Sequence, residues 1–129
     1  MGVEPDVVEE DFAEQLERTC RTAVGDGLRS ITYFTREGHV QVYLRSDLEA
    51  DADLAGFVEQ AVDGFHARTA YRGSELGDYR YTVRAFENGY LTRVTAEDHG
   101  VFITTDAMTL RSAEGVAEAL VGVLAERSA

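Results

Sequence analysis

Three stretches of the chain repeat apolar residues at the spacing of an α-helix. The first covers Val7–Val24, and the second lies within Asp47–Arg68. The third begins at Leu110 or Ser112 and ends at Glu126. The second helix has the most continuous apolar stripe, formed by Leu54, Phe57, Val58, Ala61, Val62 and Phe65. Each stripe requires another apolar surface to pack against.

Glycine and aspartate residues mark the ends and the weak points of these helices. The turn Gly25–Gly27 ends the first helix. Asp51 or Asp53 is expected to cap the N-terminus of the second. In the third helix, Gly115 and Gly122 either lower its intrinsic stability or let it pack closely against a neighbour.

Five stretches rich in β-branched and aromatic residues are predicted to be strands. Two of them form a hairpin and the other three a meander, because short turns join them. The Asn88-Gly89 turn is the clearest hairpin signal, since both residues tolerate positive φ. The strands are Leu28–Thr35, Val40–Arg45, Tyr79–Phe86, Tyr90–Ala96 and Val101–Thr105.

The element order is therefore α-β-β-α-β-β-β-α, which predicts an α+β fold with one five-stranded antiparallel sheet. Several strands carry apolar residues on both faces, as Val101 and Ile103 do opposite Phe102. A sheet of this kind must be covered on both sides. We expect the two terminal helices on one face and the middle helix on the other. Residues 1–129 are expected to form one domain, with residues 1–6 as a flexible N-terminus.

Charge narrows the functional classes. The 129 residues include 24 acids and 12 basic residues, giving a net charge of −12, and every basic residue is arginine. Such an acid excess is typical of a halophilic cytoplasm, although an ordinary acidic protein fits as well. Duplex nucleic acid is a poor partner without a basic cluster. No apolar run approaches the roughly 18 residues of a membrane span, and the single cysteine fits a cytoplasmic location.

No grouping typical of catalysis, metal binding or cofactor binding is found in the sequence. The three histidines, His39, His66 and His99, lack metal-ligand spacing, and His66 is expected on a solvated surface. Cys20 falls on the apolar face of the first helix, so we expect it to be buried and structural. The chain is therefore not expected to be an enzyme or to hold a cofactor.

Four arginines form the one candidate cluster of charge. Arg80 and Arg84 are predicted to share a face of the third strand, with Arg93 across from one of them and Arg72 in the preceding loop. Such a cluster can bind a carboxylate, a phosphate or an acidic partner. The alternative is that these arginines pair with nearby carboxylates across the strands.

The segment Phe86–Thr105, FENGYLTRVTAEDHGVFITT, resembles the meander of the roadblock fold, a relative of the longin and profilin-like folds. The element order from Val7 to Glu126 resembles that fold as well. Two further segments, Cys20–Thr35 and Tyr71–Val94, resemble a small haloarchaeal family of unknown function.

The roadblock resemblance implies how this chain functions. Roadblock-like proteins commonly dimerise, by extending the sheet or by pairing the middle helices, and often bind small GTPases. For this chain, the resemblance implies a homodimeric adaptor or regulator, for example of a small GTPase, with its partner surface on Asp53–Arg68 and Tyr79–Phe86. The alternative hypothesis is a domain that senses a small anion near Arg72, Arg80 and Arg84. The candidate partner-binding residues are Phe57, Phe65, Tyr71, Arg72, Arg80 and Arg84.

Overall fold

A computed structural model describes residues 9–50, 52–54 and 56–128 of the chain. The predicted N-terminal segment 1–6 and the predicted cap Asp51 lie outside these residues. The elements are α1 (Glu10–Val24), a 3₁₀ turn (Gly25–Gly27), β1 (Leu28–Thr35), β2 (His39–Leu44), α2 (Phe57–Ala61), α3 (Asp63–Ala70), β3 (Thr82–Phe86), β4 (Gly89–Thr95), β5 (His99–Thr105) and α4 (Leu110–Ser128).

The five strands form one antiparallel sheet in the order β2-β1-β5-β4-β3. The hairpin β1–β2 and the meander β3–β4–β5 join through the pairing of β1 with β5, which places Ile31 opposite Ile103. The predicted fold class is thus confirmed. The two edges of the sheet are β2 and β3.

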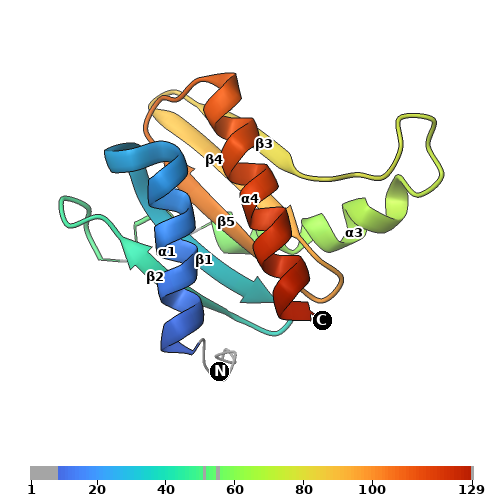
Figure 1. Ribbon diagram of the computed structural model, residues 1–129, viewed down its shortest axis with the longest axis horizontal. Helices are drawn as coiled ribbons and strands as arrows, with labels where there is room; N and C mark the ends of the chain where they lie inside the picture. The colour runs from blue at the N-terminus through green and yellow to red at the C-terminus, as the bar shows by residue number, and fades with distance from the viewer. Residues whose placement is uncertain (1–8, 51, 55, 129) are drawn as a thin grey trace.

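The terminal helices cover one face of the sheet. Figure 1 shows α1 and α4 side by side in front of the strands. Phe12 and Leu16 of α1 and Leu120 of α4 pack there against the strand residues Ile31 and Val101, and all five side chains are buried. Cys20 is buried in the same layer, as predicted. None of the described helices is both long and apolar enough to cross a lipid bilayer.

The middle helices cover the opposite face only in part. Phe34 and Phe102 point to this side and pack with Ala61 of α2, Phe65 of α3 and Leu91 of β4. The alternation of apolar residues along β1 and β5 therefore supplies both layers, as predicted. This second core is smaller than the first, because α2 and α3 are short.

The second predicted helix is wrong at its start and in its continuity. It begins at Phe57, and it breaks at Val62, which separates α2 from α3. Asp53 does not cap it: this residue has φ of 65° and its carboxylate binds Arg29. Gly56, with φ of 80°, sets the direction in which α2 begins. The apolar stripe predicted the helix, but these two left-handed residues delay its first turn.

The third strand is also shorter than predicted, because it begins at Thr82 rather than Tyr79. Residues before it form a long connection from α3. The connection extends beyond the body of the sheet together with the end of α3 (Figure 1). Because β3 starts late and the connection lies away from it, this edge strand is exposed along most of its length.

Candidate protein-interaction surface

An apolar hollow of about 310 Å³ lies between the start of α2 and the edge of the sheet. We call it the α2–β3 cavity. It exists because α2 is only one turn long and leaves β3 and the adjoining part of β4 uncovered. Its lining residues are Gly56, Phe57, Gln60, Ala61, Arg84, Phe86, Leu91, Arg93 and Phe102.

Aromatic side chains form the walls of this cavity. The ring of Phe57 lies edge-on to that of Phe86, with centroids 5.7 Å apart, and 6.4 Å from the centroid of Phe102. Phe102 is fully buried, whereas Phe86 remains 49% exposed at the end of the edge strand. Large apolar side chains that stay exposed beside a hollow are typical of interaction surfaces.

Arg93 lies at the polar end of the cavity and is only 5% exposed. Its guanidinium donates to the backbone oxygen of Gln60 at 3.1 Å, to the hydroxyl of Thr82 at 3.1 Å and to that of Tyr79 at 3.3 Å. All three acceptors are uncharged, and its Nε has no hydrogen-bond partner. A buried cation without a counter-ion is unfavourable, so this end of the cavity suits a negatively charged group.

Gly64 explains how α3 approaches the strand that carries Arg93. A Cβ added at Gly64 would lie 2.6 Å from Cγ2 of Thr95 and 2.8 Å from Nε of Arg93. The absence of a side chain therefore lets α3 lie directly on β4. The hydroxyl of Thr95 donates to the backbone oxygen of Gly64 at 3.3 Å, which holds the same contact.

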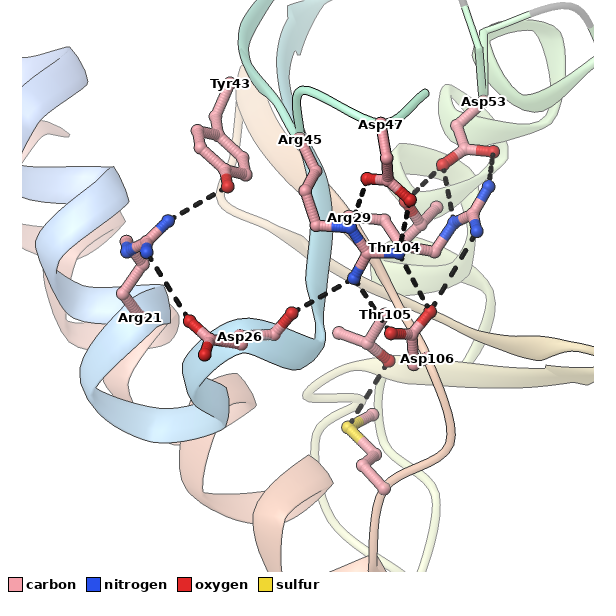
Figure 2. A network of polar contacts seen from close by, with 11 residues as sticks. Arg21, Asp26, Arg29, Tyr43, Arg45, Asp47, Asp53, Thr104, Thr105 and Asp106 are labelled. Carbon is pink, nitrogen blue, oxygen red and sulfur yellow. Dashed lines mark hydrogen bonds and ion pairs between the residues drawn. The ribbon is translucent and has the colours of Figure 1, made fainter. Parts of the chain in front are cut away.

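A network of arginines and aspartates anchors the chain just before α2 (Figure 2). Arg29 donates two hydrogen bonds to the Asp53 carboxylate, at 3.1 and 3.2 Å, and Thr104 donates a third at 2.6 Å. Arg45 binds the carboxylates of Asp106 and Asp47 beside it. Because Asp53 lies three residues before Gly56, this network fixes the chain close to the start of α2.

The environment of Asp53 keeps its carboxyl ionised. Burial alone would raise the pKa of Asp53, but the hydrogen bonds from Arg29 and Thr104 outweigh it, so the pKa lies below its usual value. Arg29, Asp53 and Thr104 also line a second hollow of about 370 Å³, which shares Phe57 and Phe86 with the α2–β3 cavity. The two hollows therefore adjoin each other at the Phe57–Phe86 contact.

The structure separates the predicted partner-binding residues into three groups. Phe57 and Arg84 line the α2–β3 cavity. Phe65 does not line it: this residue is buried against Phe34, with the Arg36 guanidinium 4.3 Å from its ring centroid. The third group, Tyr71, Arg72 and Arg80, lies away from this cavity, along the connection between α3 and β3.

The predicted arrangement of arginines on one strand face is wrong. Arg80 precedes β3, and its guanidinium pairs with Glu118 of α4, on the opposite side of the sheet from Arg84. Arg93 pairs in register with Thr82 and with neither of the other two arginines. The physical reason is the late start of β3, which frees Arg80 from the strand's alternation.

Arg72 and Arg80 do share a separate polar hollow of about 310 Å³ with Arg68. Arg68 donates to the backbone oxygen of Thr95, and Arg80 is paired with Glu118, so two of these three arginines already have partners. Arg80 thus does pair with a carboxylate, but that carboxylate belongs to helix α4 and does not lie across the strands, as the alternative had it.

Sequence reasoning missed Phe86, Leu91 and Phe102 as surface or cavity residues. The signal was present for Phe86, because it shares its strand face with Thr82 and Arg84 and lies next to the predicted turn. Leu91 and Phe102 could be predicted only as core residues. Their contribution to a cavity depends on the shortness of α2, which the apolar stripe concealed.

The histidines and the cysteine do not form a reactive site in the described part of the chain. His99, predicted in a turn, begins β5, and its Nδ1 lies 2.8 Å from the Tyr33 hydroxyl in a buried contact. Burial raises the pKa of the Cys20 thiol to about 12, so the thiol stays protonated. His66 is exposed, as predicted. Among the described residues, no group of three metal-ligating side chains comes together.

Comparisons with known proteins agree with the fold. The family model described as Domain of unknown function (DUF7522) matches residues 14–125. The chain is similar to a structure described as MglB with tetrameric arrangement, at 16% identity and a TM-score of 0.62, covering 96% of this chain and 98% of that one. Myxococcus xanthus MglB gives 9% identity and a TM-score of 0.64, covering 95% and 92%.

A third structure, the gliding protein MglB from Thermus thermophilus, gives 17% identity and a TM-score of 0.56, covering 96% of this chain and 99% of that one. No curated protein sequence matches the chain. At these identities the similarity shows the fold alone. The MglB structures have a roadblock-like fold, so the predicted roadblock-like architecture is confirmed.

Proposed function

The chain belongs to the family described as Domain of unknown function (DUF7522), and we propose that it is a non-enzymatic protein-interaction module that works as a homodimer. Its binding surface is the concave surface of the α2–β3 cavity together with the edge of β3. In this role the chain is an adaptor or regulator and carries out no chemistry itself.

The observation that carries this proposal is an apolar cavity next to an unpaired edge strand. Phe86 is half-exposed at the mouth of the cavity, and Val83 is exposed on the same strand. Every second backbone N–H and C=O group of an edge strand points away from its neighbour and can pair with another chain. Apolar surface beside such an edge favours a partner that covers both.

The charges around this surface suit a second copy of the same chain. Arg84 lies in the middle of β3, while Glu59 on α2 and Glu87 in the adjoining turn are exposed nearby. A two-fold axis brings each feature of a surface against its counterparts in the other copy. An arginine at the centre of this edge can therefore pair with a carboxylate that the second copy brings to it.

The structural neighbours support an assembly as well. One of them is described as MglB with a tetrameric arrangement. The roadblock resemblance further implies a protein partner of the small GTPase class, which the dimer would bind as an adaptor or regulator. The acid excess supports a cytoplasm of high salt, in which the charge of −12 keeps the surface hydrated.

Sedimentation equilibrium of the purified chain in concentrated KCl tests the homodimer. We expect a reversible dimer, and we expect Phe86→Asp to weaken it at least about tenfold, because central aromatic residues dominate interface energies. Since Phe86 is already half-exposed, losing its contact with Phe57 should destabilise the monomer by only about 1–2 kcal/mol, and its thermal unfolding curve should show that it stays folded.

Leu110→Asp is the matched control. Leu110 is exposed at the start of α4, the helix that covers the other face of the sheet, so its replacement should not change the dimer dissociation constant. A chain that stays monomeric at every concentration, or a dimer equally sensitive to both substitutions, would contradict the proposal.

A further inference from the structure

The α2–β3 cavity contains two arginines that lack a carboxylate partner. Among the ion pairs of the described residues, none includes Arg84 or Arg93. Arg84 is exposed at the mouth, and Arg93 is buried with three uncharged acceptors. The rest of the lining is mainly aromatic and aliphatic. The cavity is therefore complementary to an apolar side chain that has a carboxylate next to it.

The connection between α3 and β3 displays such a pair of side chains. Leu76 is 99% exposed, the most exposed large apolar residue of the described chain, and Glu75 precedes it. The backbone N–H of Gly77 donates to the oxygen of Ser74 at 3.0 Å, which makes Glu75 and Leu76 the central residues of a β-turn. The turn projects beyond the end of α3 (Figure 1).

This turn is fixed before any partner binds. The Ser74 hydroxyl donates to the backbone oxygen of Gly77, and the Ser74 N–H donates to the oxygen of Tyr71. Gly73 and Gly77 have positive φ, which glycine adopts without strain. A preformed turn binds with a smaller entropic cost than a flexible loop. Its exposed leucine adds nothing to the core of its own protomer.

The position of the turn relative to β3 makes an exchange between two copies possible. The turn lies just before the start of β3 at Thr82, and the cavity runs along the strand, where Arg84 in the middle and Phe86 at the other end line it. Antiparallel pairing of two β3 strands about Arg84 places the start of one beside the end of the other. Leu76 precedes Thr82 by six residues, which can span up to about 20 Å.

We propose that the turn carrying Glu75 and Leu76 of one protomer inserts into the α2–β3 cavity of a second copy, and reciprocally. Leu76 fills the apolar part of the cavity, and the Glu75 carboxylate pairs with Arg84 and Arg93. This inference rests on the homodimer proposed above and names the contacts that make it specific. The two Glu75 carboxylates also offset the repulsion between the two Arg84 side chains, which face each other at the two-fold axis.

Dimer dissociation constants, measured by sedimentation equilibrium at one fixed salt concentration, test the insertion. Leu76→Asp, Glu75→Arg and Arg84→Glu should each weaken the dimer about tenfold. The double variant Glu75→Arg with Arg84→Glu restores opposite charges and should return to within about threefold of the original value. Leu76 and Glu75 are exposed in the protomer, so their variants should fold normally.

Glu114→Arg is the control for charge, because it makes the same change in net charge at an exposed position of α4. It should leave the dimer unchanged. If Phe86→Asp dissociates the dimer while Leu76→Asp and Glu75→Arg do not, the insertion is wrong and the homodimer stands. If the original chain never dimerises, both proposals fail. If the cavity instead binds a small amphipathic carboxylate, Leu76→Asp and Glu75→Arg should leave the dimer intact, which also contradicts the insertion.

Discussion

At the scale of single residues, Asp53 links the polar network to the interaction surface. It has φ of 65°, Arg29 and Thr104 bind its carboxylate, and it lies four residues before the start of α2 at Phe57. Because Thr104 donates its hydroxyl proton to Asp53, Ser30 must donate in its 2.6 Å contact with Thr104. One ionised carboxylate thus orders hydroxyls on two strands.

Asp53→Asn tests this role. We expect it to lower the free energy of unfolding at pH 7 by about 2 kcal/mol, since hydrogen bonds to the charged carboxylate are lost while asparagine tolerates the positive φ. The folded-state pKa is depressed, so the contribution of Asp53 is complete above its unfolded pKa of about 3.9 and is lost as pH falls through the lower folded value.

The difference in free energy of unfolding between the original chain and Asp53→Asn, measured with urea, should therefore narrow below about pH 4. Asp26→Asn is the control, because Asp26 is fully exposed in its ion pair with Arg21, and its loss should leave the urea midpoint almost unchanged. A difference between Asp53→Asn and the original chain that does not depend on pH would refute this role of the charge.

At the scale of elements, Gly64 determines how closely α3 packs on β4. Gly64→Ala should destabilise the fold by about 1–3 kcal/mol, because the new Cβ overlaps Thr95 and Arg93 and overpacking forces shifts. Gly115→Ala in α4 meets nothing within 4 Å and should stabilise the fold by up to about 1 kcal/mol through helix propensity. In thermal unfolding, Gly64→Ala should lower the midpoint and Gly115→Ala should raise it. Equal changes in the two midpoints would contradict the close packing of α3 on β4.

The elements also show how far the sequence could predict the structure. Periodicity predicted α1, α4 and all five strands, since Ile31 and Phe34 or Val101 and Phe102 already indicated opposite faces. It could not predict the late start of α2. That start follows the anchored residue Asp53, whose partner Thr104 lies 51 residues along the chain. Gly115 looked equally ambiguous in the sequence, and the open space around it favours the effect on helix stability over close packing.

The candidate site was less predictable than the fold for the same reason. Phe57 and Arg84 were identified, but Arg84 was grouped with Arg80, because a longer strand would have placed both on one face. Only the register of β3 with β4, in which Thr82 faces Arg93, separates them. Cavities arise where elements stop short of covering each other, and a pattern of apolar residues does not specify those lengths.

At the scale of the whole molecule, the two faces of the sheet differ in completeness. One face is closed by two long helices, α1 and α4, and contains the larger core. The other is covered in part by α2 and α3 and ends at an open edge strand. A second copy of the chain, as proposed above, would complete this open side.

Hydrogen exchange measured at several protein concentrations tests that proposal most directly, because it compares the two edges of the sheet in one experiment. We predict that amides of β3 and α2 exchange more slowly as concentration rises from below to above the dimer dissociation constant. Amides of β2, the opposite edge, should be unaffected. Exchange that is independent of concentration throughout the chain, or slowing at β2 in place of β3, would contradict it.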